Sequence, residues 1–485
     1  MSLIKKLPLF LLAATILLES CEPKDKTTDP KPTVITANAG TDQAVNTGQV
    51  VTLTGSTANN NENKTVTYSW SFIRKPANSQ ATLTGANTVN PTFTPDLPGE
   101  YELELTITAG DVTAKDKVLV SVTFAPMVLT DIEKATVLED RTPDPNAADY
   151  YVNDDINVDS DLTIKPGVVI AFAEDAIMFV NGNAAFVAKG DANKKVKFTG
   201  KLANRGHWAG ILIYSTNSLN EISQAEVLYA GSEEIISGVG AAITLADRAR
   251  LNINNTTIAE SGANGMFLDD GSLLVAFANN TFKNNAAAPL VTYAANVPKL
   301  DAPSVFNSNN GKNVIEVKRS TIEGAAEITW PAFNDNTPYR FVEFINVNTG
   351  WKLMPGVTIE VADDNHFDVG DGYIKAVGTA ERKITFTGVT KTTGSWNGIV
   401  IYPRSANNIM ENVQISYAGG EEMISGIKAG ITVTHGGSLA IRKSIVNNSG
   451  GYGIHVNGDD VTVNADVETA NTFSSNIQGK VYYNH

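Results

Sequence analysis

The feature that most restricts the fold of this chain is a long internal repeat. The tripeptide Ile-Asn-Val at positions 156–158 recurs at 345–347. The segment 225–245 matches the segment 413–433 at 11 of 21 positions, and the offset in the chain is nearly the same as for the tripeptide. Because chance similarity does not hold a nearly constant offset over such distances, the sequence predicts two homologous copies of one structural unit.

A shorter period lies inside each copy. The spacing from Ile243 to Met266 is the same as the spacing from Ile431 to Ile454. Short β-branched runs between these positions are separated by Gly, Asn and Ser, and no segment shows the period of an amphipathic helix. This pattern is typical of a parallel β-solenoid, whose coils stack about 4.8 Å apart.

Over roughly residues 126–485 the pattern resembles a right-handed parallel β-helix. The resemblance implies that apolar side chains from successive coils stack in a dry interior. We expect this of Val169, Ile211, Ile243, Met266, Ile399, Ile431 and Ile454. The Asn pairs at 254–255, 279–280 and 447–448 are expected at coil turns, since Asn tolerates the left-handed backbone conformation.

The segment from about residue 34 to 122 has a different pattern. Apolar and polar side chains alternate strictly between positions 100 and 107, which predicts a half-buried strand of an antiparallel sandwich. Its landmarks are Ala-Gly-Thr-Asp at 39–42, Tyr68 and Trp70, Pro-Thr-Phe-Thr-Pro at 91–95, and Gly99 and Tyr101. These residues resemble the PKD-like immunoglobulin-type domain, which implies a core role for Trp70 and a spacer or adhesive role for the domain.

The N-terminus has the pattern of a secretion signal. Lys5 and Lys6 precede a mostly apolar stretch at 7–18, which is shorter than the roughly 20 residues that span a bilayer. The next residues, Leu18 to Cys21, resemble the lipobox of bacterial lipoproteins. The resemblance implies cleavage before Cys21 and attachment of a lipid to its thiol. An ordinary signal peptide with a chance cysteine is the alternative.

Residues 22–33 contain three prolines and six charged residues, so this segment is predicted to be an extended tether of up to about 40 Å.

Taken together, these patterns predict an all-β chain, a small β-sandwich followed by a right-handed parallel β-helix in two homologous copies. Its predicted parts are a lipoprotein signal peptide (1–20), the lipidated Cys21 with the tether (21–33), the PKD-like sandwich (34–125), β-helix copy 1 (126–294), a connecting segment (295–318) and β-helix copy 2 (319–485).

Charge and cysteine content exclude several classes of function. The 52 acidic residues outnumber the 37 basic ones, giving a net charge of −15, so nucleic acids and other polyanions would be repelled. A single cysteine excludes a disulfide framework and a Cys-based zinc site. The five histidines lack the spacing of a metal pair, and we predict neither a metal site nor a cofactor.

Two pairs of acidic residues are the main candidates for a ligand site. Glu233 and Glu234 follow a Tyr-Ala-Gly element in the first copy, and Glu421 and Glu422 follow it in the second. Paired carboxylates on a loop can bind calcium or act as acid and base in glycoside cleavage. The alternative is a solvated coil turn retained through duplication, because charged runs usually lie on the surface.

Trp208 and Trp396 occupy equivalent positions in the two copies. Their rings could stack on sugars in a binding site on the side of the solenoid. The alternative is that both tryptophans are core or rim residues that anchor the coil.

These features together favour a non-catalytic surface lipoprotein. We expect it to lie in the bacterial outer membrane, held there by the lipid on Cys21, and to bind polysaccharides or proteins of the envelope or cell exterior as an adhesion module. The alternative is a polysaccharide lyase or glycoside hydrolase, since many β-helix proteins are such enzymes. Asp269, Asp270 and His435 are isolated matches to the pectin hydrolase set and lack its other members, so no catalytic residue is predicted.

Overall fold

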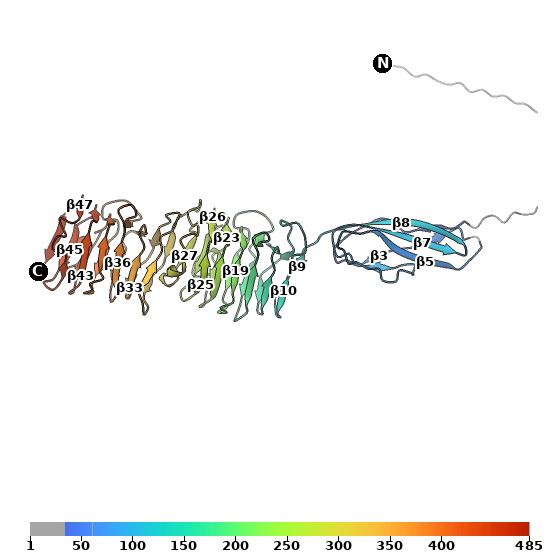
Figure 1. The fold of residues 1–485 in the computed structure, drawn as a ribbon, viewed down its shortest axis with the longest axis horizontal. Coiled ribbons are helices and arrows are strands. Elements are labelled where there is room, and N and C mark those ends of the chain that lie inside the picture. The colour runs from blue at the N-terminus through green and yellow to red at the C-terminus, as the bar shows by residue number, and fades with distance from the viewer. Residues whose placement is uncertain (1–33, 61, 485) are drawn as a thin grey trace, which may run out of the picture. The chain divides into compact units, whose positions relative to one another are not determined.

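The computed structural model describes residues 34–60 and 62–484. The chain divides into two compact units, one ending at Phe124 and the other beginning at Ala125. Both are built from β-strands (Figure 1), and the helix found in the described part is the short 3₁₀ helix η1 (Ala294–Lys299). The predicted signal peptide, Cys21 and the tether lie outside the described residues.

The N-terminal unit is a sandwich of mainly antiparallel strands. Its largest sheet consists of β2 (Gln43–Asn46), β8 (Val112–Thr123), β7 (Gly99–Ala109) and β5 (Val66–Arg74). The remaining strands form two pairs, β1 (Thr36–Asn38) with β4 (Ser56–Ala58) and β3 (Val51–Thr52) with β6 (Thr92–Phe93). Tyr101, Leu103, Leu105 and Ile107 of β7 are fully buried, as their alternation predicts, and Trp70 lies in the same core.

The second unit is a stack of parallel strands. In its first half three sheets surround the interior, and strands recur in each sheet once per coil. The seven-stranded sheet consists of β26 (Thr281–Lys283), β23 (Thr257–Ala259), β20 (Ala225–Leu228), β17 (Val196–Gly200), β14 (Val169–Phe172), β11 (Tyr150–Val152) and β9 (Met127–Val128). A six-stranded sheet consists of β10 (Thr136–Leu138), β13 (Leu162–Ile164), β16 (Phe186–Lys189), β19 (Glu221–Ser223), β22 (Arg250–Asn254) and β25 (Leu273–Ala278).

The third sheet continues through both halves of the unit. Its thirteen strands are β12 (Ile156–Val158), β15 (Ile177–Val180), β18 (Gly210–Ile213), β21 (Ala241–Leu245), β24 (Asn264–Leu268), β27 (Leu290–Thr292), β28 (Ile315–Val317), β31 (Tyr339–Phe341), β34 (Thr358–Val361), β37 (Ile384–Gly388), β40 (Val413–Ser416), β44 (Ile445–Asn447) and β47 (Thr472–Ser474). At about 4.8 Å per strand, this sheet is about 58 Å long.

Two new sheets complete the second half. The eight-stranded sheet consists of β29 (Ser320–Ile322), β32 (Ile345–Val347), β35 (His366–Val369), β38 (Gly398–Ile401), β42 (Ile427–Thr434), β45 (Tyr452–Asn457) and β48 (Gly479–Asn484), with β41 (Glu422–Ile424) paired to β42. The other sheet consists of β30 (Ile328–Trp330), β33 (Gly350–Leu353), β36 (Tyr373–Val377), β39 (Ile409–Glu411), β43 (Ser438–Arg442) and β46 (Thr462–Val463). The all-β fold class, a sandwich followed by a parallel β-helix, is therefore confirmed.

The two halves form one solenoid. β28, within the predicted connecting segment 295–318, pairs in parallel with β27 on one side and with β31 on the other. Matching sequences nevertheless occupy different sheets, because Phe-Thr-Gly at 198–200 lies in β17 of the seven-stranded sheet and the same tripeptide at 386–388 lies in β37 of the thirteen-stranded sheet. The strands of the second half are thus shifted by one sheet around the coil.

One hydrophobic core runs through both halves. It contains Ile211, Ile243, Met266, Ile399, Ile431 and Ile454, as predicted. The prediction for Val169 is wrong: Val168 and Ile170 belong to the core instead, because Val169 pairs with Lys197 on the outer side of its sheet. The Asn turns are confirmed, since Asn255, Asn279 and Asn448 have positive φ angles between 51° and 54°.

Candidate functional site

The structure excludes the two predicted tryptophans from direct contact with a ligand. Trp208 and Trp396 have no exposed surface. The indole Nε1 of Trp208 donates a hydrogen bond to the Leu228 carbonyl oxygen at 2.8 Å, and that of Trp396 donates to the Ser416 carbonyl oxygen at 2.9 Å. Trp208 also stacks on Phe172, with ring centroids 4.0 Å apart. The prediction that they bind sugars is therefore wrong, and both anchor the coil from inside.

The four glutamates lie on two short β-hairpins. Hairpin 1 (residues 233–239) turns at Ser237 and Gly238, with φ angles of 54° and 69°. Hairpin 2 (residues 421–428) turns at Ser425 and Gly426, with φ angles of 53° and 71°. Two successive residues with positive φ define the type I′ turn, whose twist suits a tight hairpin. The repeated Ser-Gly dipeptide therefore fixes the same hairpin twice.

The two glutamate pairs are not brought together. All four carboxylates are exposed; hairpin 1 leads into β21 of the thirteen-stranded sheet, and hairpin 2 includes the start of β42 in the eight-stranded sheet. Glu234 lines a hollow of about 410 Å³ on the outer face of the thirteen-stranded sheet, together with Lys312 and Lys318. The hairpins are therefore two separate surface elements, and the first borders a hollow.

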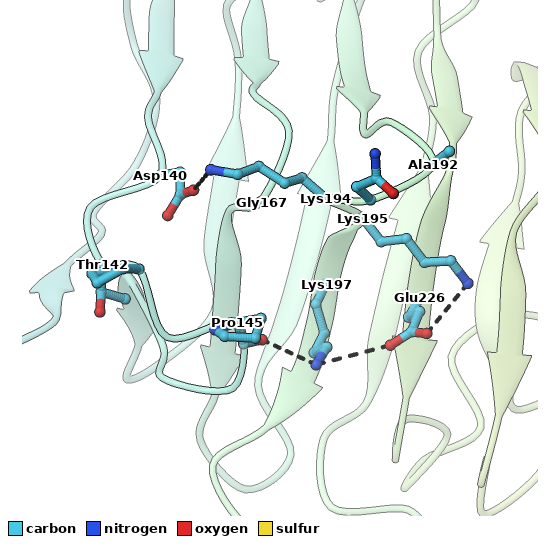
Figure 2. A pocket seen from close by; sticks show the side chains of 11 residues that line it. Asp140, Thr142, Pro145, Gly167, Ala192, Lys194, Lys195, Lys197 and Glu226 are labelled. Carbon is cyan, nitrogen blue, oxygen red and sulfur yellow. Dashed lines mark hydrogen bonds and ion pairs between the residues drawn. The ribbon is translucent and has the colours of Figure 1, made fainter.

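A second hollow, of about 270 Å³, lies on the seven-stranded sheet and was not predicted from the sequence (Figure 2). We call it the lysine groove. Its walls carry the carboxylates of Asp140 and Glu226 and the ammonium groups of three lysines, and its lining includes two proline rings. These lysines and prolines are Lys194, Lys195, Lys197, Pro143 and Pro145.

Ion pairs fix the side chains of the lysine groove. Lys194 Nζ lies 2.8 Å from Asp140 Oδ2, and Glu226 bridges Lys195 at 3.4 Å and Lys197 at 3.9 Å. Figure 2 shows Lys197 between Glu226 and Pro145, whose carbonyl oxygen accepts a hydrogen bond from Nζ at 3.2 Å. The groove thus presents ammonium groups and carboxylates side by side.

Sequence reasoning missed this groove because its parts are distant in the chain. The Lys-Lys-Val-Lys run at 194–197 was a local signal, but its partner Asp140 lies 54 residues earlier. Only the stacking of coils brings the loop around Pro145 over the outward side chains of β17 and β20.

A third group of titratable side chains lies on the outer face of the eight-stranded sheet. Asp368 Oδ1 is buried, has no hydrogen-bond partner among the described residues, and lies 3.7 Å from His366 Nε2. Burial raises the pKa of Asp368 to about 6 and lowers the pKa of His366 below its ordinary value. A carboxyl group whose pKa lies near neutrality can both accept and donate a proton, as a general acid or base must.

Within the described residues, no cluster of three or more His, Cys, Asp or Glu side chains has the arrangement of a metal site. In the N-terminal unit, burial alone would raise the pKa of Asp96, but hydrogen bonds from Ser79, the Gln80 amide and the Tyr101 hydroxyl lower it. Asp42 accepts a hydrogen bond from the backbone amide of Leu119. Both carboxylates therefore stabilise the sandwich. No helix of the described part has the length and apolar character needed to cross a membrane.

The chain thus joins a small sandwich to a parallel β-helix, and comparison with known proteins identifies the first of these. Residues 39–122 match a family model described as a PKD domain, and this segment forms a PKD domain. Similar solved structures include a PKD domain from human KIAA0319, which is 19% identical with a TM-score of 0.18, covering 21% of this chain and 94% of that one. A PKD domain from the KIAA 1837 protein is 26% identical with a TM-score of 0.16, covering 18% of this chain and 85% of that one.

A third solved structure is a nucleoside hydrolase-related hypothetical protein from Saccharophagus degradans, described as associated with carbohydrate metabolism. It is 17% identical with a TM-score of 0.15, and the match covers 17% of this chain and 22% of that one. No curated protein matches the chain. The comparisons therefore identify the PKD domain at residues 39–122.

Proposed function

We propose that this protein is a non-catalytic binding or adhesion module of the bacterial cell envelope, which holds glycans or partner proteins on the side faces of its β-helix. The lysine groove is the observation that carries this proposal. Its rim alternates hydrogen-bond donors on three lysines with acceptors on Asp140 and Glu226, around the rings of Pro143 and Pro145. Sugars match such a surface, because each hydroxyl both donates and accepts while the ring carbons are apolar.

The lipid anchor and the duplication are part of the same proposal. A lipid on Cys21 and the tether at 22–33 would hold the PKD domain, as a spacer, at the outer membrane and expose the β-helix at the cell surface. Replacing Cys21 with Ser should move the protein from the membrane fraction to the soluble fraction and abolish labelling with radioactive palmitate. A Cys21→Ser protein that stays in the membrane fraction would contradict lipid anchoring.

The origin of the second half by duplication is supported by local geometry that recurs at equivalent positions of the two copies. The indole hydrogen bonds of Trp208 and Trp396, the two I′ turns, and the positive φ angles of Tyr229 and Tyr417 (64° and 66°) are equivalent. We propose a right-handed coil for both halves, with the second copy joined one sheet further around the coil.

The binding function can be tested on the full chain purified in detergent. Native gels containing neutral or acidic polysaccharides should retard the protein, and the same mixtures should release no reducing sugar ends. Replacing Lys197 and Glu226 together with Met and Gln removes charges of both signs, so the net charge is unchanged, and should abolish retardation by the ligands of the groove. Retardation unchanged in this variant would contradict a binding role for the lysine groove.

A polysaccharide-cleaving enzyme is the second candidate. It is favoured by Asp368, whose Oδ1 has no hydrogen-bond partner among the described residues and lies 3.7 Å from His366 Nε2, and whose pKa burial raises to about 6. If the protein releases sugar ends and Asp368 is the acid catalyst, Asp368→Asn should abolish the release. Glu233→Gln and Glu421→Gln test in the same way whether the hairpin carboxylates are required. Release that depends on any of these residues would replace the binding function with an enzymatic one.

A further inference from the structure

The junction between the two halves of the β-helix carries two adjoining hollows. The first is the 410 Å³ hollow beside hairpin 1, and the second, of about 480 Å³, lies beside η1. The two hollows share a wall. Three pairs of residues that are close in sequence form this wall, with one residue of each pair facing each hollow. Val291 and Tyr293, Lys318 and Arg319, and Glu343 and Phe344 are the three such pairs. We call the two hollows together the junction groove.

The groove exists because the coil changes its cross-section here. The seven-stranded and first six-stranded sheets end at β26 and β25, and two new sheets begin at β29 and β30. Between β27 and β28 the chain forms η1 and a long loop in place of regular strands. Of the sheets in the described part, only the thirteen-stranded one continues across this junction. The first hollow lies on its outer face, and the second lies against β29 and β32, where the eight-stranded sheet begins.

Aromatic rings line this groove without being fully buried. Tyr293 and Phe344 are half-buried and line the hollow of about 480 Å³ beside η1. The ring centroids of Phe344 and His366 lie 5.0 Å apart. Tyr293 also packs against a small apolar cluster on the outer face that includes Phe267 and Val291. The tyrosine ring is therefore held in place from behind, which lowers the entropic cost of stacking a ligand on its free side.

We propose that the junction groove binds an extended neutral glycan, with Tyr293 and Phe344 as stacking platforms. The proposal rests on the binding function proposed above and names a second site for it. Each hollow has the volume of a small-ligand pocket, and the two adjoin through the three residue pairs, which suits a chain of sugar units better than a single ring. A protein segment is the competing occupant and is an outcome of the test below.

The charges along the groove favour a neutral ligand. Its lining contains five carboxylates and three basic groups: Glu234, Glu316, Glu343, Asp270 and Glu323, against Lys312, Lys318 and Arg319. Lys312 is paired with Glu316 at 2.8 Å and Arg319 with Glu343 at 3.7 Å, so the excess charge is negative. Burial, and to a lesser extent nearby carboxylates, raises the pKa of the Tyr293 hydroxyl. A uronate or sulfated chain would be repelled, whereas sugar hydroxyls can donate to these carboxylates.

The test is affinity electrophoresis of the full chain in detergent. Retardation is measured in gels that contain hydroxyethylcellulose, galactomannan, xylan or polygalacturonate. At least one of the three neutral polymers should retard the protein, with little change between low and high salt because no net charge is paired. Tyr293→Ala should weaken that binding about tenfold, as loss of a buried aromatic contact does in other interfaces. Tyr293→Phe keeps the ring and should bind within about threefold of the parent chain.

Two further variants guard against an effect on folding. Arg319→Ala changes an exposed rim side chain and should weaken binding without altering the melting temperature. Tyr214→Ala removes a half-buried tyrosine elsewhere on the first half and should leave binding unchanged. If the neutral polymers bind but Tyr293→Ala and Phe344→Ala bind as well as the parent, the junction site is wrong and the binding function stands.

The remaining outcomes also decide. Binding of polygalacturonate alone, lost in the lysine-groove variant, would place the ligand in the lysine groove and overturn the junction proposal. Absence of retardation by any polymer, together with capture of an envelope protein that depends on Tyr293, would replace the glycan with a protein segment and also overturn it. Absence of both would overturn the binding function itself.

Discussion

His455 and Tyr482 lie directly opposite each other on the adjacent strands β45 and β48, with ring centroids 5.7 Å apart. His455 is completely buried on the outer side of its sheet, and neither of its ring nitrogens has a hydrogen-bond partner in the described part of the chain. The equivalent residue of the first half is Phe267, which packs with hairpin 1 in an apolar cluster. The second half therefore has a titratable ring where the first half has a purely apolar one.

This substitution predicts that hairpin 2 loosens in acid. Burial lowers the pKa of His455, so the packed state favours the neutral ring. The neutral His455 ring contributes its full stabilisation of the folded state above the ordinary histidine pKa of about 6.5. This stabilisation is lost as the pH falls below that value towards the lower pKa of the folded state. Relative to the intrinsic exchange rate at each pH, amide hydrogen exchange in β41 should be faster at pH 5 than at pH 7. The titratable and charged groups on the strands packed around His455 are Tyr452, Lys480, Tyr482, Tyr483, Glu422 and Lys428.

Two variants separate His455 from those other groups. His455→Phe should make exchange in hairpin 2 independent of pH in this range, apart from the intrinsic exchange rate. Phe267→His should give hairpin 1 the acid sensitivity that it lacks in the parent chain. If hairpin 2 opens equally in acid with phenylalanine at position 455, one of the surrounding groups and not His455 is responsible.

The stability of the β-helix should also depend on Asp368. Its pKa of about 6 lies above the ordinary value of 3.8, because burial disfavours the charged carboxylate. Folding therefore favours the protonated form of Asp368. The contribution of this form to the unfolding free energy is complete below pH 3.8 and is lost as the pH rises through 6. Asp368→Asn should raise the unfolding free energy at pH 7.5 by up to about 3 kcal/mol and leave it nearly unchanged at pH 4.

Urea unfolding at several pH values measures this effect. His366→Gln is the matched control, because His366 Nε2 lies only 3.7 Å from the carboxylate and is itself a titratable group whose pKa burial lowers. The difference between pH 4 and pH 7.5 should persist in His366→Gln and shrink in Asp368→Asn. The reverse pattern would assign the pH dependence to the histidine.

The periodicity of the sequence was sufficient to predict the solenoid, because each coil repeats a local pattern. Ile243 and Met266 are one coil apart and stack in the core as their spacing indicated. Direction within a strand was harder to predict. In the run Val168, Val169 and Ile170, three similar side chains give no alternation, and the outward position of Val169 depends on its register with Lys197.

The candidate sites were predicted less well, since they depend on which distant coils meet. The exposed glutamates were found as local doublets, but their role depends on the hollow that Glu234 shares with Lys312 and Lys318. Tyr293 carried no motif, because its half-exposed position results from the change of sheets at the junction. A repeated tryptophan suggested a platform, yet repetition at a fixed coil position is also what a core anchor requires.

The tryptophans give the last prediction, which distinguishes a core anchor from a platform. Trp208→Ala or Trp396→Ala leaves a large cavity beside Phe172 or Phe367 and frees a carbonyl oxygen, so each should lower the unfolding free energy by about 3–5 kcal/mol. Trp208→Phe retains most of the packing but leaves the Leu228 carbonyl without its donor, which should cost about 1–3 kcal/mol. Polysaccharide binding by the folded Trp208→Phe protein should equal that of the parent. If instead this variant kept its stability and lost its ligand, Trp208 would have to become exposed in the bound state.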